Sequence, residues 1–245
     1  MSPAMPLSPA PGRADTEAEA APGGSPLSLW PLALGLVVLA GLWLGPLPQR
    51  AQGSFAAHMV MHMGVVAVAA PLLAIGLLRL WPRAFSQVTP ALAILASFAE
   101  FAVVWTWHAP ALHDAARASF PLLLVEQACF IGAGLFVWIT AIGTATAGDG
   151  KSVGGRAAGT LALLVTSMHM TLLGALLLLS PRPLYACADL CSPAASFTPL
   201  GDQQAGGVVM LIVGGASYLA GGLALLATVL KERAPAGGDN AEAIP

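Results

Sequence analysis

The stretch HMVMHMGVVAVAAPLLAIGLL, residues 58–78, runs for 21 residues without a single Asp, Glu, Lys or Arg. A helix that crosses the roughly 30 Å hydrocarbon core of a bilayer needs about 20 predominantly apolar residues. The stretch therefore predicts a transmembrane helix. Its first six residues, HMVMHM, hold two histidines and three methionines where lipid-facing aliphatic side chains would be expected.

Five further stretches satisfy the same length requirement, and helix-breaking prolines and glycines separate them. The six predicted spans cover about 28–46, 57–79, 90–108, 120–142, 157–180 and 205–230. The chain is 57% hydrophobic and only 9% charged, far from the average soluble protein. We predict an all-α membrane protein in which a bundle of six transmembrane helices occupies residues 28–232. The small and polar residues of 1–27 and 233–245 predict disordered tails.

The positive charges are distributed unevenly between the two ends of the predicted spans. The end that includes both tails carries Arg13, Arg79, Arg83, Lys151, Arg156, Lys231 and Arg233, whereas the other carries Arg50, Arg117 and Arg182. The positive-inside rule therefore predicts a multi-pass membrane protein with both termini in the cytoplasm. A formal net charge of -2 gives no basic surface that could bind nucleic acid. Because the predicted spans are apolar, the lipid bilayer is the expected partner.

The pair His58 and His62 begins the second span at its outer end. Residues four apart share one face of a helix, so both imidazoles can reach one ion. Met59 and Met63 form a parallel pair rotated by about 100°. Imidazole together with soft thioether favours copper, especially Cu(I), over calcium or magnesium. We therefore predict a copper site near the outer surface.

Other candidate ligands fall in the outer half of the predicted spans or near their middle. His108 ends the third span, His169 and Met170 lie in the fifth, and Asp202 precedes the last. The predicted metal-binding residues are His58, Met59, His62, Met63, His108, His169, Met170 and Asp202. A lone intramembrane histidine can instead form a hydrogen bond between helices, and methionine can simply fill a core. His113 is expected to be a solvated loop residue.

Two carboxylates lie inside predicted spans, Glu100 in the third and Glu126 in the fourth. Charged groups at such depth are costly, so we expect both to face the interior of the bundle and to have a function there. Cys129 is expected to be a small buried hydrophobe. Cys187 and Cys191 form a CxxxC pair in an outer loop, where a disulfide or a metal-binding thiol pair are both open.

Four segments together resemble a known family. HMVMHMGVVAVAAPLLAIG, WTWHAPALHDAA, MHMTLLGALLLLSPRPLYA and LGDQQAGGVVM are similar, in the same order, to motifs of the membrane-embedded CtaG family. Its members are assembly factors associated with caa-type cytochrome c oxidases, and the similarity runs from about residue 57 to 210. The matching positions are His58, Met59, His62, Met63, His108, Pro110, Asp114, His169, Met170, Asp202 and Gln203.

The resemblance implies a role in maturing a terminal oxidase, with copper as the metal handled and oxidase subunits as partners. Two positions depart from the family pattern: His113 stands where a Tyr is frequent, and Gln127 where a His often follows the Glu. If that His is a ligand in relatives, Glu126 and Cys129 are the residues that could replace it here.

The leading hypothesis is an outward copper site that receives the ion and passes it inward toward His169 and Met170, or on to the oxidase. No nucleophile is paired with a base, so we do not expect an enzyme. One alternative is a haem-binding electron-transfer protein with His62 and His169 as axial ligands. Another is a proton or metal-ion transporter that uses Glu100 and Glu126.

Overall fold

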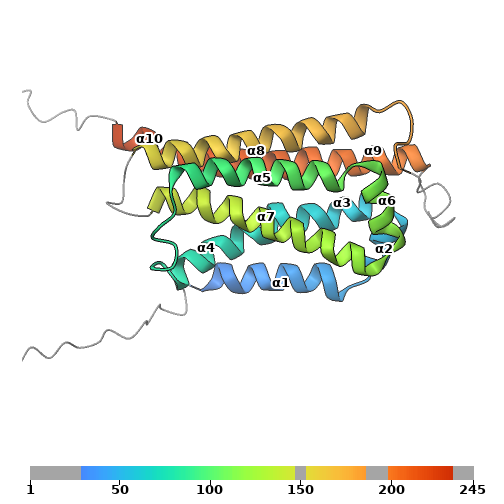
Figure 1. The fold of residues 1–245 in the computed structure, drawn as a ribbon, viewed down its shortest axis with the longest axis horizontal. Coiled ribbons are helices and arrows are strands. Elements are labelled where there is room, and N and C mark those ends of the chain that lie inside the picture. Colours follow the sequence, from blue (N-terminus) through green and yellow to red (C-terminus); the bar gives the residue numbers. More distant parts are fainter. Residues whose placement is uncertain (1–28, 147–152, 186–197, 234–245) are drawn as a thin grey trace, which may run out of the picture.

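The computed structural model describes residues 29–146, 153–185 and 198–233, and within these ranges it is built of helices without any strand. The long helices lie side by side along one axis (Figure 1). The all-α prediction is confirmed. The helices are α1 (Trp30–Leu44), α2 (Leu47–Gly53), α3 (Phe55–Met63), η2 (Gly64–Ala69), α4 (Ala70–Leu80), α5 (Pro90–Trp107), α6 (Pro110–Ala118), α7 (Phe120–Thr146), α8 (Val153–Leu179), α9 (Pro199–Val209), η4 (Met210–Gly214) and α10 (Gly215–Arg233), where η marks a π-helical segment.

Five helices in the described ranges are long and apolar enough to cross a membrane. They are Phe55–Leu80, Pro90–Trp107, Phe120–Ala145, Val153–Leu179 and Pro199–Lys231. A sixth candidate is α1 together with α2, which bend by 55° relative to each other. This is a multi-pass membrane protein, and the predicted number of spans matches the upper count. The predicted tails lie outside the described residues, apart from Arg233 at the end of α10, and so do Cys187 and Cys191.

Two of the spans contain a π-helical segment, η2 between α3 and α4 and η4 between α9 and α10. Around η2, backbone carbonyls accept hydrogen bonds from other helices. The Trp138 indole N–H donates to the Val66 carbonyl at 3.1 Å, and the Ser217 hydroxyl donates to the Ala67 carbonyl at 2.6 Å. Because lipid offers no competing partners, such bonds tie spans together within the bilayer.

Two glycines let α8 and α9 approach closely. A Cβ atom added at Gly174 would lie 2.8 Å from the Leu211 nitrogen, and one at Gly207 would lie 2.7 Å from the Leu178 nitrogen. Any larger side chain at these positions would push the two backbones apart. The close packing also fixes α9, whose first turn lies against the start of α3 through Asp202.

The segment between the predicted spans 90–108 and 120–142, where His113 was expected to lie in a loop, instead contains the helix α6. Pro110 stands in its first turn, a position that needs no backbone N–H donor. In Figure 1, α6 and α2 lie at the same end of the bundle as the start of α3. The short α6 buries His113 and Arg117, so the prediction that His113 is a solvated loop residue is wrong.

Candidate metal centre

Four histidines and one glutamate gather at the end of the bundle that α6 covers. They come from four elements: His58 and His62 from α3, His108 from the C-terminus of α5, His113 from α6, and Glu126 from α7. All five side chains are buried. The imidazole centroids of His58 and His113 lie 4.9 Å apart, and those of His62 and His108 lie 5.3 Å apart. We call these five residues the histidine cluster.

Three members of the cluster, His58, His113 and Glu126, each offer a ligand atom within 4.8 Å of the other two. The shortest described separation is 3.6 Å, between His58 Nε2 and Glu126 Oε1. Two donors on one ion lie at most about 4 Å apart, since each metal–nitrogen or metal–oxygen bond is about 2 Å long. Shifts of less than about 1 Å would therefore bring all three donors onto a single ion.

Most polar atoms of the cluster have no hydrogen-bond partner in the described part of the chain. This holds for both ring nitrogens of His58, His62 and His113, for His108 Nε2, and for Glu126 Oε1. Buried polar groups in native proteins are ordinarily hydrogen-bonded, because leaving them unpaired costs the full desolvation penalty. Several unpaired nitrogen atoms and one unpaired oxygen atom therefore converge on one place. They fit a bound cation, to which they would donate their lone pairs.

The ring of His108 is oriented by the backbone. Its Nδ1 lies 2.7 Å from the Val104 carbonyl oxygen, which can only accept, so Nδ1 carries the proton and Nε2 offers a lone pair. In a histidine that binds a metal through one ring nitrogen, the other ring nitrogen commonly donates its hydrogen to a backbone carbonyl. The Tyr185 hydroxyl donates to the His108 carbonyl at 3.0 Å, which ties the residues after α8 to the cluster.

Aromatic rings separate the cluster from its surroundings. The Tyr185 ring lies 4.3 Å from the His113 ring and stacks at 4.8 Å on Phe55, measured between centroids. On the deeper side, the Phe130 ring lies 3.8 Å from that of His62. These contacts exclude water, so an ion held here would interact with its ligands in a low dielectric.

One buried cation stands beside the cluster. The guanidinium nitrogens of Arg117 have no hydrogen-bond partner among the described residues. Burial lowers the pKa of Arg117 to about 10, while the carboxylates of Glu126, Asp202 and Asp114 act in the opposite direction. Arg117 therefore stays charged at neutral pH. Burial, and then the charge of Arg117, hold the pKa of His113 well below its ordinary value, so this imidazole is neutral and able to bind a metal.

Asp202, predicted as a ligand, contacts the N-terminus of α3 instead. Its carboxylate accepts hydrogen bonds from the Ser54 hydroxyl at 2.7 Å, the Phe55 N–H at 2.6 Å and the Ala56 N–H at 3.2 Å. A carboxylate is favourable there because the first N–H groups of a helix have no partner within it. Asp202 thereby fixes the start of the helix that carries His58.

The predicted methionine ligands contact glycines of the last span. Met59 packs over Gly206 of α9, with its Cγ 2.9 Å from where a Cβ of that glycine would be. The Met63 sulfur and the Met170 Cβ both lie over Gly214, at 2.9 and 3.5 Å from the corresponding point. The thioethers thus fill the seam between α3, α8 and the last span.

His169 lies apart from the cluster. Its ring meets the Phe101 ring of α5 edge-on at 5.4 Å, and neither of its nitrogens has a partner in the described part of the chain. Of the eight predicted ligands, the structure brings together the imidazoles of His58, His62 and His108. It adds His113 and Glu126, which were not among the eight.

The two intramembrane carboxylates belong to different groups of residues. Both are fully buried, which confirms the prediction that they face the bundle interior. Glu126 belongs to the histidine cluster, whereas Glu100 accepts a short hydrogen bond from the Tyr218 hydroxyl of α10. One turn of α5 away from Glu100, the hydroxyls of Ser97 and Thr166 lie 3.0 Å apart.

The fold and the cluster define a class: a multi-pass helical membrane protein with imidazole and carboxylate donors buried at one end of its bundle. The chain belongs to the family of cytochrome c oxidase caa3 assembly factors, whose family model matches residues 22–232. This match confirms the resemblance seen in the four motifs. No curated protein and no solved structure matches the chain.

Proposed function

We propose that this protein binds copper in the histidine cluster and hands it to a subunit of the oxidase that it helps to assemble. The observation that carries the proposal is the convergence of unpaired imidazole nitrogens with Glu126 in a buried space. Imidazole is a ligand for copper, zinc, iron and nickel, and among divalent first-row ions Cu²⁺ binds a given site most tightly. Copper is here a cargo, and we assign the protein no catalysis of its own.

The kind of ligand atoms in the histidine cluster bears on which oxidation state of copper it would bind. The sequence favoured Cu(I) because methionines alternate with histidines, but Met59 and Met63 pack toward α9 and η4. Imidazole with a carboxylate is a harder donor set than imidazole with thioether, so we propose Cu(II) in the cluster. Met63, Met170 and His169 remain candidates for a deeper, softer site that would receive Cu(I).

The site would lie on the outer side of a bacterial plasma membrane, with both termini in the cytoplasm. This orientation rests on the charge asymmetry of the loops. The metal centres of a terminal oxidase would then be loaded from outside the cell membrane. The partner we propose is the oxidase subunit whose copper centre is exposed on that side during assembly.

Metal analysis of the detergent-purified protein after copper loading tests the proposal. We expect about one copper per chain in the wild type and a loss of most of it in His58→Ala and in His113→Ala. When the protein is loaded with Cu(II), His169→Ala is the matched control, since it removes a buried imidazole that lies outside the cluster. Equal copper in the wild type and in His58→Ala would refute the ligand assignment.

A second experiment tests the assembly role. Deleting the gene should lower the spectral signal of the assembled oxidase, and expressing the wild-type chain should restore it while His58→Ala does not. Undiminished oxidase in the deletion strain would contradict the role, whatever the purified protein binds.

The purified protein also tests the haem alternative, because axial ligation by His62 and His169 would give a Soret band. Those two imidazoles contact different neighbours, Phe130 and Phe101, and the alternative gains no support from the described residues.

A further inference from the structure

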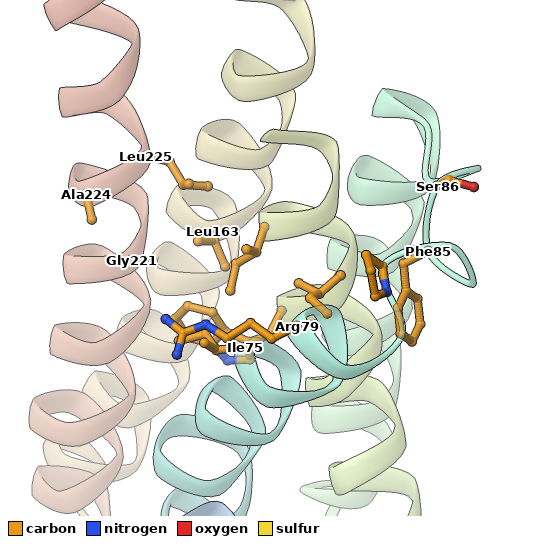
Figure 2. A pocket seen from close by; sticks show the side chains of 12 residues that line it. Ile75, Arg79, Phe85, Ser86, Leu163, Gly221, Ala224 and Leu225 are labelled. Atoms are coloured by element: carbon orange, nitrogen blue, oxygen red, sulfur yellow. The ribbon is translucent and has the colours of Figure 1, made fainter. Parts of the chain in front are cut away.

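A cavity of about 640 Å³ lies at the other end of the bundle from the histidine cluster. Its walls come from α4 and the turn that follows it, and from α7, α8 and α10 (Figure 2). Trp138, Ile142, Leu163 and Leu225 supply much of the apolar surface. The volume falls within the roughly 300–1,000 Å³ of sites that enclose an organic molecule.

Among the residues that the structure describes, the only charged one that lines this cavity is Arg79, and Ser86 is the only other polar side chain apart from the Trp138 indole. In Figure 2 the Arg79 side chain extends from α4 across the cavity toward α10. The indole N–H of Trp138 already donates to the Val66 carbonyl and is not available to a ligand. The cavity therefore presents a long apolar surface with a single cation.

The chemistry of these walls limits what can occupy the cavity. A buried water needs two to four polar partners, which this lining does not supply. A transmembrane helix of a partner is too wide, because a cylinder about 10 Å across would exhaust the volume in under about two turns. Hydrocarbon chains surround the helices of a membrane protein, and they fit an apolar cavity without any desolvation cost.

We propose that the cavity binds one acyl chain of an anionic phospholipid, whose phosphate pairs with the guanidinium of Arg79. Basic pockets between transmembrane helices at the positively charged side of a membrane are suited to anionic headgroups. Arg83, exposed in the turn after α4, raises the positive potential at the mouth without lining the cavity. The lipid would hold the end of α4 against α10, and this site is independent of the copper proposal.

Native mass spectrometry in detergent tests the site with phosphatidylglycerol and phosphatidylcholine that carry the same acyl chains. An arginine near the headgroups favours an anionic lipid by about fivefold, so we expect the wild type to retain phosphatidylglycerol with about that preference. Arg79→Gln should abolish the preference. Arg83→Gln is the matched control, which removes a neighbouring arginine outside the cavity and should keep most of it.

The apolar part of the site is tested separately with Ala224→Trp, which places an indole into the cavity. We expect this variant to lose bound lipid of both kinds. A photoreactive phosphatidylglycerol with a diazirine in its acyl chain should label wild-type peptides around residues 75–86 and 221–225, a readout that needs no variant to fold. Equal retention of the two lipids by the wild type, an unchanged preference in Arg79→Gln, or labelling spread evenly over all helices would overturn the proposal.

Discussion

The Nε2 atom of His58 lies 3.6 Å from the Oε1 atom of Glu126, and both side chains are completely buried. Burying the negative charge of a carboxylate costs far more free energy than its contact with a neutral imidazole contributes. A positive charge bound by both groups would offset that cost. A cation shared by the two, with His113 as a third donor, would supply that charge. The pair is thus the most direct place to test for a metal.

Glu126→Gln should weaken copper binding by about 10- to 100-fold while leaving the fold intact, because the amide keeps the shape of the side chain and loses its charge. The measurement is a competition titration against a copper chelator. Glu100→Gln provides the matched control, since it neutralises the other fully buried carboxylate of the spans. An equal loss in both variants would mean that a general change in the bundle, and not ligation, lies behind the effect.

Asp202→Ala should destabilise the protein by about 1–3 kcal/mol, because the Ser54 hydroxyl and two backbone N–H groups of α3 lose their acceptor. Thermal unfolding in detergent gives the size of the change. Ser54→Ala, which removes the cap of α3, should cost about 1 kcal/mol. Abolished copper binding with unchanged stability in Asp202→Ala would show instead that Asp202 is a ligand, as the sequence predicts.

Replacing Met63 and Met170 together by Leu should leave copper bound to the histidine cluster unchanged. Both side chains pack over Gly214, so a volume-conserving exchange costs less than about 1.5 kcal/mol at each position. Copper stoichiometry measured after loading with Cu(II) checks the expectation. A large loss would place a thioether among the ligands of the loaded ion, in agreement with the mixed His and Met site that the sequence favours.

The spans could be predicted because each depends on one property, an apolar run of sufficient length. The shared face of His58 and His62 followed in the same way from helical periodicity, whereas Met59 and Met63 were predicted to join them as ligands and instead contact glycines of the last span. The π-helical segments η2 and η4 lie inside apolar runs such as GVVAVA, where nothing in the residue types distinguishes a wider turn from an ordinary one.

His113 was misplaced for a different reason. The sequence PALHDAARA is polar between two long apolar runs, and a short polar connection is typical of an exposed loop. The signal that could have identified α6 is the four-residue spacing of His113 and Arg117 after Pro110, which puts both side chains on one helical face. The described partners of Asp202, the Ser54 hydroxyl and two backbone N–H groups, lie 146 to 148 residues earlier, and no local pattern in the sequence reports such a contact.

Tyr218→Phe should destabilise the bundle more than Glu100→Gln. The phenylalanine variant leaves Glu100 without its donor, and its other carboxylate oxygen already has no partner within the described residues. A buried group that loses a hydrogen-bond partner costs about 1–3 kcal/mol, and more when it is charged. The glutamine variant keeps an oxygen that accepts from the Tyr218 hydroxyl. Unfolding temperatures in the reverse order would show that Tyr218 does not hold this carboxyl group.

Arg117→Gln should tighten copper binding. The guanidinium is buried, charged and close enough to the cluster to lower the pKa of His113, so it repels any cation held there. Unit charges 4 Å apart interact by about 1 kcal/mol in a water-like dielectric and by more in a protein interior, which corresponds to at least about fivefold in affinity. Chelator competition measures the change.

Two control variants should leave the copper affinity near that of the wild type. Arg117→Lys keeps the charge, and Arg50→Gln removes an exposed arginine of α2. If Arg117→Gln instead weakened binding, Arg117 would act by positioning Glu126 and not by repelling the ion.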